Sequence, residues 1–151
     1  MTQSEIISNF YRAFQQLDVE KMVSYYHDDI EFTDPGFGTL KGNDVKNMWR
    51  MICSRAKDFS LDFSSVTETS AHWDTTYTFS TTGNKVSNSI DATFEFKDGK
   101  ISKHVDVFNL HKWASQALGF KGRLLGGTNF FKKKLNKQTQ TLLAKYTTKH
   151  S

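Results

Sequence analysis

The first third of the chain carries apolar residues at helical spacing. Between residues 4 and 17 they recur every three or four positions, which predicts a helix with one apolar face. Asp18 stands where a helix N-cap is favoured, and the apolar positions after it predict a short second helix. The first face consists of Ile6, Ile7, Phe10, Tyr11, Phe14 and Leu17, and the second of Val19, Met22, Val23 and Tyr26.

Residues 27–42 interrupt this helical pattern. They contain the single proline of the chain and three glycines, which predict a loop that leaves room for only a short strand. The polar run His27-Asp28-Asp29 is expected to be a solvated helix end. A third helix is predicted after Asn43 or Asp44. Its apolar stripe would be Val45, Met48, Trp49, Ile52, Cys53 and Ala56.

After Lys57 the period of the apolar positions changes from about 3.6 to 2, which is typical of half-buried strands. The sequences TTGNK (81–85) and KDGK (97–100) predict turns between strands, and residues 101–110 predict a last long strand. Helices followed by consecutive strands favour an α+β fold. The alternating positions are Phe59, Leu61 and Phe63, then Trp73, Tyr77 and Phe79, then Val86, Ile90, Ala92, Phe94 and Phe96.

Charge divides the chain at about residue 118. Residues 1–118 hold 12 Lys/Arg and 16 Asp/Glu, whereas residues 119–151 hold 8 Lys/Arg and no acidic residue. We expect a domain at 1–118 and a basic extension at 119–151, made of a glycine-punctuated loop and an amphipathic helix. That helix would dock through Phe131, Leu135, Leu142 and Tyr146 on the same domain or on a dimer partner; a membrane-surface helix is the alternative. No nucleic-acid partner is expected, although a basic tail of this kind could contact one.

Several classes of protein are disfavoured by what the sequence lacks. No apolar run reaches the ~20 residues of a transmembrane helix, and the N-terminal residues show no secretion signal. The single cysteine, Cys53, fits a reducing compartment, so a cytoplasmic location is expected. No phosphate-binding glycine loop, zinc cysteine cluster or nucleophile elbow is present. His72 and Asp74 have metal-like spacing but no third ligand nearby, so neither a metal nor a cofactor is predicted.

Two strings carry a resemblance to a known family. FYRAFQQLDVEKMVSYYHDDIEFTDPGFGTLKG (10–42) and FEFKDGKISKHVDVFNLHKW (94–113) resemble the nuclear transport factor 2-like superfamily, and its SnoaL-like and ketosteroid-isomerase-like branch in particular. The resemblance covers residues 4–113. It implies a cone-shaped fold in which helices pack on a curved, mixed or antiparallel sheet around a pocket. It also implies a homodimer. Because this superfamily places many chemistries in one cavity, the resemblance is specific for the fold and not for the activity.

Asp34 is the first candidate catalytic residue. The string Phe32-Thr33-Asp34-Pro35 matches the short segment that supplies the catalytic base in ketosteroid isomerases, so the resemblance gives Asp34 that role. A carboxylate facing an apolar cavity would also have a raised pKa, which suits acid–base work. The alternative is an aspartate that organises a turn through its own backbone.

His104 and Asp106 form the second candidate pair. Spaced by two on a predicted strand, they point to one face together with Phe108 and Leu110, while Val105 and Val107 share the opposite face with Ile101. Both faces of the strand therefore look buried. In SnoaL-like cyclases a similar H-x-D string places its aspartate in the cavity as the acid/base, which by resemblance assigns that role to Asp106. The alternative is a structural pair.

The ketosteroid isomerase pattern is incomplete. Where that family has a tyrosine that donates a hydrogen bond to the oxyanion, this chain has Phe10. The nearest hydroxyl is that of Tyr11, one step around the helix. Ala92 stands where the second, protonated aspartate is expected. Steroid isomerisation is therefore disfavoured, and an enolate would need another donor, such as Tyr26, His104 or a Trp N–H.

Aromatic residues are the third feature that points to a pocket. The expected lining comprises Phe10, Tyr11, Phe14, Tyr26, Phe37, Trp49, Trp73 and Phe108. The functional hypothesis is a cofactor-free isomerase, cyclase or dehydratase that acts on a small, largely apolar carbonyl or hydroxyl compound. The alternative is a non-catalytic ligand-binding or assembly module of the same fold.

Overall fold

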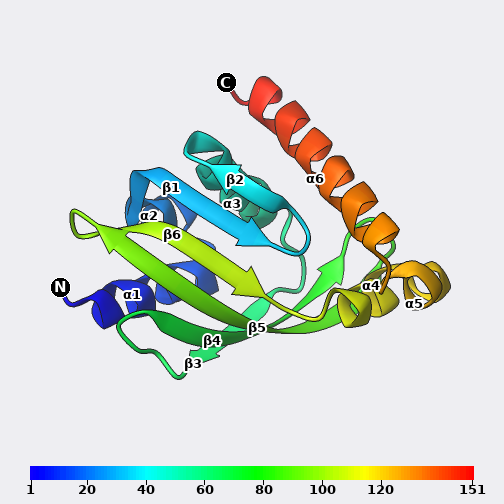
Figure 1. The fold of residues 1–151 in the computed structure, drawn as a ribbon, viewed down its shortest axis with the longest axis horizontal. Coiled ribbons are helices and arrows are strands. Elements are labelled where there is room, and N and C mark those ends of the chain that lie inside the picture. The colour runs from blue at the N-terminus through cyan, green and yellow to red at the C-terminus, as the bar shows by residue number, and fades with distance from the viewer.

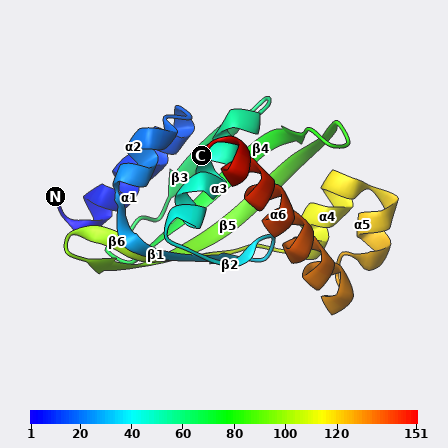
Figure 2. The same ribbon diagram turned by 90° about the horizontal axis from the view of Figure 1, so that it is seen from above.

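The protein was analysed as a computed structural model that describes residues 1–151. A six-stranded sheet is covered on one side by the N-terminal helices, and three further helices follow it in the chain (Figures 1 and 2). The elements are α1 (Gln3–Gln15), α2 (Val19–Ser24), β1 (Tyr26–Asp34), β2 (Gly38–Lys41), α3 (Asn43–Arg55), β3 (Ser60–Ser64), β4 (Ser70–Phe79), β5 (Asn84–Lys97), β6 (Lys100–Val107), α4 (Leu110–Leu118), α5 (Phe120–Leu125) and α6 (Asn129–Lys149).

The sheet has the strand order β2-β1-β6-β5-β4-β3. Neighbouring strands are antiparallel except β1 and β6, which run parallel, so the sheet is mixed. The predicted α+β class is confirmed. The turn between β5 and β6 has positive φ at both Asp98 and Gly99, the conformation that a tight two-residue hairpin requires.

The predicted N-terminal helices are present with their caps. Thr2 and Glu5 form a capping box at the start of α1, and the Asp18 side chain accepts a hydrogen bond from the Lys21 backbone N–H at the start of α2. The helices bury their apolar faces against the sheet in one core cluster. At α1 the buried residues are Ile6, Ile7, Phe10, Tyr11, Ala13 and Phe14.

The prediction of a loop between residues 27 and 42 is wrong. Helix α2 ends at Ser24, and Tyr26 begins the nine-residue strand β1. Strand β1 forms because it pairs with two neighbours, β2 and β6, and because Ile30 and Phe32 are fully buried. Local turn propensity is overridden by this long-range pairing. Asp28 and Asp29 lie where the β1–β6 register shifts, and both side chains are exposed.

The last strand is shorter than predicted. Strand β6 ends at Val107, and Asn109 caps the new helix α4, so Leu110 does not share a strand face with His104. A register shift between β5 and β6 turns Ile101 inward, where it is fully buried. Val107 on the outer face is 60 % exposed, so in this chain alone β6 is not buried on both faces.

After β6 the chain continues in the three helices α4, α5 and α6. The glycine-punctuated segment predicted as a loop contains α5, which packs on α4. Helix α6 runs along the β1–β2 loop and reaches α3 near the C-terminus (Figures 1 and 2). Leu143 faces the core with 3 % exposure, whereas Leu142, predicted on that face, is 46 % exposed. None of the helices has the length and apolar character needed to cross a membrane.

Candidate functional site

A chain of hydrogen bonds runs through the interior between α3, β1 and β6. The Trp49 indole N–H donates to the Tyr26 hydroxyl at 2.8 Å, and the same hydroxyl lies 2.8 Å from Nδ1 of His104. Nε2 of His104 lies 2.8 Å from Oδ1 of Asp106. All four side chains are at most 3 % exposed. Buried polar groups of this kind are costly unless paired, and here each finds a partner.

The direction of these bonds favours one tautomer of His104. A carboxylate only accepts, so Nε2 carries the proton that is donated to Asp106. Nδ1 is then free to accept from the Tyr26 hydroxyl, which itself accepts from Trp49. In this arrangement each N–H and O–H of the chain has an acceptor, and His104 orients the Asp106 carboxylate.

Asp106 keeps one oxygen available. Its Oδ1 accepts one hydrogen bond from Nε2 of His104 and a second, at 3.5 Å, from the indole N–H of Trp73. Its Oδ2 accepts no hydrogen bond from the protein. Neighbouring side chains therefore hold the carboxylate in place through one oxygen and leave the other without a protein partner.

Asp34 lies beside Asp106. The parallel register pairs Phe32 with His104 and Thr33 with Val105, so the next positions, Asp34 and Asp106, follow on adjacent strands with the same facing. Burial, aided by the charge of Asp106, raises the pKa of Asp34 to about 7. Asp34 still has some accessible surface, so it occupies the rim of the interior and not its centre.

Asp34 also organises the turn that follows it. Its Oδ1 accepts the backbone N–H groups of Gly36 at 3.0 Å and Phe37 at 2.6 Å. The turn-forming role considered from sequence is thus present. It occupies one oxygen only, and Oδ2 has no protein partner.

Tyr11 is the unusual tyrosine of the interior. Its hydroxyl is the one fully buried side-chain polar atom in the chain without a hydrogen-bond partner. Burial, with a contribution from the charge of Asp106, raises the pKa of Tyr11 well above its ordinary value, so the hydroxyl keeps its proton. Phe10 and Tyr11 are both fully buried, so the step around the helix does not carry Tyr11 out of the interior.

The predicted lining residues converge on this region and pack against one another. Tyr11 stacks on Phe63, Phe14 contacts both Trp49 and Trp73, and Phe10 contacts Tyr26. Six of the eight are buried, namely Phe10, Tyr11, Phe14, Tyr26, Trp49 and Trp73. Phe37 and Phe108 are half-buried at the edge of the same cluster.

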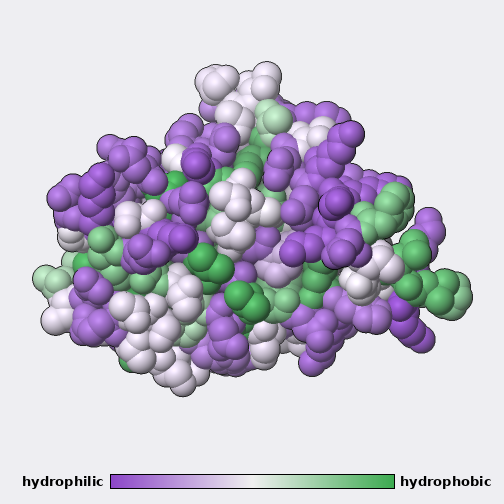
Figure 3. Space-filling view, in the orientation of Figure 1, coloured by the Kyte–Doolittle hydropathy of each residue, from purple (hydrophilic) through white to green (hydrophobic).

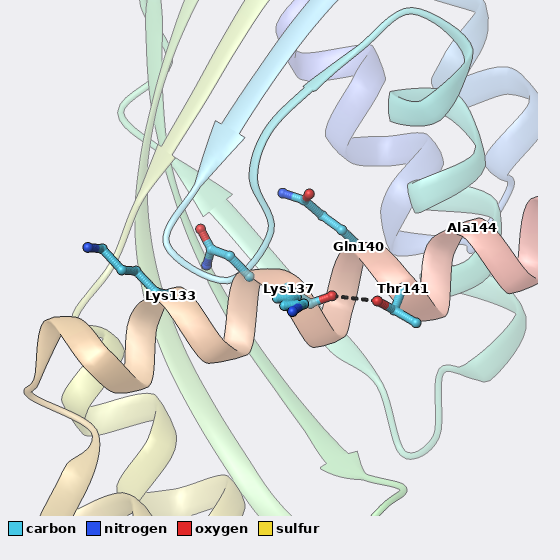
Figure 4. Close-up of a pocket in the computed structure, with 6 residues that line it drawn as sticks. Lys133, Lys137, Gln140, Thr141 and Ala144 are labelled. Atoms are coloured by element: carbon cyan, nitrogen blue, oxygen red, sulfur yellow. Dashed lines mark hydrogen bonds between the residues drawn. The ribbon is translucent and has the colours of Figure 1, made fainter.

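Two hollows elsewhere on the molecule are poor candidates for an apolar ligand. One, of about 540 Å³, is lined only by α6 side chains, and Ala144 is its single hydrophobic residue (Figure 4). The other, of about 190 Å³, has no hydrophobic lining residue. Neither includes Asp34, His104 or Asp106. The convergent polar groups of the interior are therefore the candidate site.

The rim holds residues that the sequence analysis did not assign to the site. Burial, aided by the charge of Asp34, raises the pKa of Tyr77. The Tyr77 hydroxyl accepts a hydrogen bond from the Trp113 indole N–H at 2.7 Å. Tyr77 shares strand parity with Trp73, which was a usable signal. Trp113 lies on α4 (Leu110–Leu118), a helix that was not predicted from the sequence.

Helix α6 closes over the same rim. Asn136 donates to the carbonyls of Pro35 and Gly36 at 2.9 and 3.0 Å, and Gln140 donates to the carbonyl of Phe37 at 2.7 Å. These bonds hold the turn that Asp34 caps. An amide side chain that binds a distant loop leaves no periodic signal, so sequence pattern could not reveal it.

His72 and Cys53 lie outside this hydrogen-bonded cluster. His72 hydrogen-bonds to Asp91 at 2.8 Å and to Asp74 at 3.1 Å, and the bond to Asp91 is the main cause of its raised pKa. Cys53 is half-buried on α3, and burial raises the pKa of its thiol to about 11. A thiol of that kind is a poor nucleophile near neutral pH.

Comparison with known proteins identifies the family. A family model described as a SnoaL-like domain matches residues 7–104, about two thirds of the chain. This segment contains Tyr11, Asp34 and His104 but ends two residues before Asp106. No curated protein matches the sequence.

Solved structures share the fold. TerC co-crystallised with polyporic acid has a TM-score of 0.65 at 19 % identity, over 77 % of this chain and 98 % of TerC. A nuclear transport factor 2-like protein of unknown function from Burkholderia pseudomallei has 0.64 at 18 %, over 78 % and 98 % of the two chains. An LEH-like epoxide hydrolase of M. tuberculosis has 0.60 at 18 %, over 81 % and 92 %. Identities this low establish the nuclear transport factor 2-like fold and not a shared activity.

Proposed function

The chain belongs to the SnoaL-like domain family, and from that premise we propose that it is a cofactor-free enzyme acting on a small, largely apolar carbonyl or hydroxyl compound. One observation carries this proposal. An unpaired hydroxyl, that of Tyr11, lies in the same aromatic interior as the unpaired oxygens of Asp106 and Asp34. A donor and two carboxyl oxygens without protein partners are what proton transfer next to a carbonyl group requires.

The three groups take different parts in the reaction. Asp106, oriented by His104, removes a proton from the carbon beside the substrate carbonyl. The electron pair of that C–H bond moves toward the carbonyl oxygen, where the Tyr11 hydroxyl donates a hydrogen bond to the developing enolate. His104 is a positioning residue, because it holds Asp106 through Oδ1 and contacts no substrate.

Asp34 completes the proton balance. With a pKa of about 7, Asp34 is protonated in a large share of the protein molecules near neutral pH and can return a proton to the substrate. Return of a proton to a different carbon gives isomerisation, and transfer to a departing hydroxyl gives dehydration with release of water. The enolate can also attack a second carbonyl, which gives cyclisation. All three outcomes share the first proton transfer, so that step is the one to test.

The test follows hydrogen exchange in deuterated buffer. A panel of small cyclic and linear ketones is incubated with the protein, and loss of the proton signal beside the carbonyl is followed by NMR. Asp106→Asn is expected to lower the exchange rate at least about a hundredfold, the range typical of a lost general base. Tyr11→Phe is expected to lower it by a similar factor through loss of the oxyanion donor.

The matched control is Asp62→Asn, because Asp62 is an exposed carboxylate on β3 that forms no hydrogen bond or ion pair with the residues of the interior. It should exchange at the rate of the unmodified protein. Equal rates for the unmodified protein, Asp106→Asn and Asp34→Asn across the whole panel would contradict the proposal, provided that circular dichroism shows all of them folded.

The packed interior favours a second candidate function, a ligand-binding module without turnover. The aromatic rings of α1, α3 and β4 fill the region that a ligand would occupy, so only a small ligand, or one that displaces a ring, could enter. Saturable quenching of tryptophan fluorescence by a ketone that shows no exchange would favour this module over the enzyme.

A further inference from the structure

Exposed apolar side chains gather on α5 and at the start of α6. Phe120 is 70 % exposed, Leu124 63 %, Leu125 47 % and Phe130 70 %. We call these four residues the α5 patch. They make up most of the large hydrophobic side chains that the protein exposes, and hydrophobic atoms are visible at the α5 end of the molecule (Figure 3). A cluster of this kind indicates a binding surface more often than a single exposed residue does.

The orientation of the α5 patch is fixed by close packing on the opposite side of α5. Gly122 is buried so tightly against α4 that an added Cβ would come within 1.8 Å of the Ala114 carbonyl oxygen. The His111 ring also lies 2.8 Å from the Arg123 carbonyl oxygen. Because α5 presents its glycine side to α4, its large apolar side chains necessarily point away from the protein.

Positive charge surrounds the α5 patch. Lys121, Arg123, Lys132, Lys133 and Lys134 are exposed, and none of them forms an ion pair within the chain. Residues 119–151 contain no acidic residue at all. The surface therefore combines apolar side chains with unneutralised positive charge.

We propose that the α5 patch and its basic neighbours dock on the surface of an anionic lipid bilayer. The phenylalanine and leucine side chains enter the boundary between headgroups and acyl chains, and the lysines and Arg123 contact the anionic headgroups. Since no helix can cross the membrane, the contact is peripheral. The catalytic proposal is independent of this one.

Charge decides between the possible occupants of this surface. A contact that places the α5 patches of two copies against each other would bring the same basic residues of both chains together, which like-charge repulsion opposes. Nucleic acid would satisfy the lysines and could stack on phenylalanine, but it offers nothing to the two leucines. An anionic bilayer matches both the charge and the apolar side chains.

Vesicle sedimentation tests the proposal. The full chain is mixed with phosphatidylcholine vesicles, either pure or containing roughly one third phosphatidylserine. We expect at least about tenfold tighter binding to the anionic vesicles, and loss of most of that binding in about 0.5 M salt. The double variant Phe120→Ser/Leu124→Ser and the triple variant Lys132→Glu/Lys133→Glu/Lys134→Glu should each weaken binding at least about tenfold.

Matched controls are available elsewhere on the chain. Val107→Ser removes an apolar side chain that is 60 % exposed on the sheet, and Lys21→Glu/Lys100→Glu reverses exposed charges on α2 and at the β5–β6 turn, at the opposite end of the molecule from α5 (Figure 1). Both should bind vesicles like the unmodified chain. All the substituted side chains are exposed, so unchanged circular dichroism is expected.

Three results would overturn the proposal. The first is an absence of sedimentation with either kind of vesicle. The second is a dimer in analytical ultracentrifugation that Phe120→Ser/Leu124→Ser converts to monomer, without vesicle binding, since the occupant would then be a second copy. The third is binding to duplex DNA that the lysine variant alone abolishes, again without vesicle binding.

Discussion

The hydroxyl of Tyr26 lies 2.8 Å from Nδ1 of His104, although 78 residues separate the two in the sequence. This bond joins β1 to β6 inside the molecule and connects Trp49 on one side with Asp106 on the other. Tyr11, also fully buried, has a hydroxyl without any partner. The two buried tyrosines therefore differ, since the Tyr26 hydroxyl joins α3, β1 and β6 whereas the Tyr11 hydroxyl has no partner in the protein.

Replacing Tyr26 by Phe is expected to destabilise the fold. The substitution leaves the Trp49 N–H and Nδ1 of His104 buried without partners, and each such group costs about 1–3 kcal/mol. The free energy of unfolding, measured with urea, should fall by at least about 2 kcal/mol. Tyr25→Phe is the matched control, because Tyr25 is only half-buried and its hydroxyl has no partner in the protein; it should change stability little. Equal effects of the two substitutions would contradict the structural role of Tyr26.

Replacing Tyr11 by Phe is expected to have the opposite effect on stability. Removal of a buried hydroxyl that has no partner eliminates a desolvation cost, so the free energy of unfolding should rise by about 1 kcal/mol. Ketone exchange should fall at the same time, because the oxyanion donor is lost. Urea unfolding and NMR exchange on the same preparation measure both. A destabilised Tyr11→Phe protein would mean that the hydroxyl has a partner and is not free for substrate.

Asp34 is expected to make stability depend on pH. Its pKa is about 7 in the folded protein and about 3.9 in an unfolded chain. Between these values the folded state holds a proton that the unfolded state has released, so stability falls as pH rises through this window and levels off above pH 7. Asp34→Asn removes this slope while the amide oxygen can still cap the turn.

The difference between the two proteins measures the effect. The free energy of unfolding of Asp34→Asn, relative to that of the unmodified protein, should rise by on the order of 2 kcal/mol between pH 5 and pH 8. This value is below what the full pKa shift would give, because Asp34 is partly accessible to solvent. Urea unfolding at the two pH values gives the difference, and Asp62→Asn should leave the slope unchanged. A parallel pH dependence in Asp34→Asn and the unmodified protein would show that Asp34 is not the group responsible.

The elements with strong local signals could be predicted from the sequence. The stripe of α1, the Asp18 cap and the turn at Asp98-Gly99 all depend on neighbours within a few positions, and the structure has each of them. Strand β1 could not be predicted in the same way, because its partner β6 lies some 70 residues further along the chain. Helix α4 was missed because the alternation of β6 seemed to continue through Leu110.

In the candidate site too, the features with a local sequence signal could be predicted and those that depend on long-range pairing could not. Strand parity placed His104 and Asp106 on one face, and they do share a hydrogen bond. The meeting of Asp34 with Asp106 depends on the parallel register of β1 and β6, which the sequence pattern does not encode. The Tyr26 hydroxyl has hydrogen-bond partners and the Tyr11 hydroxyl has none, a difference that depends on the folded structure and leaves no sequence pattern. The functional roles of these residues stay a prediction.

Leu143 is expected to anchor α6 to the body of the protein. It is 3 % exposed and belongs to the core cluster, so Leu143→Ala should cost about 2–4 kcal/mol through lost burial and a new cavity. Leu142→Ala is a matched control on the same helix, since Leu142 is 46 % exposed, and it should stay within about 0.5 kcal/mol. Urea unfolding measures both variants. Hydrogen exchange should also show faster exchange of α6 amides in Leu143→Ala, because the helix would separate from the Pro35–Phe37 turn more often. If Leu142→Ala proved the more damaging of the two, the buried face of α6 would be the one that the sequence pattern predicted, and α6 would have to be rotated about its axis.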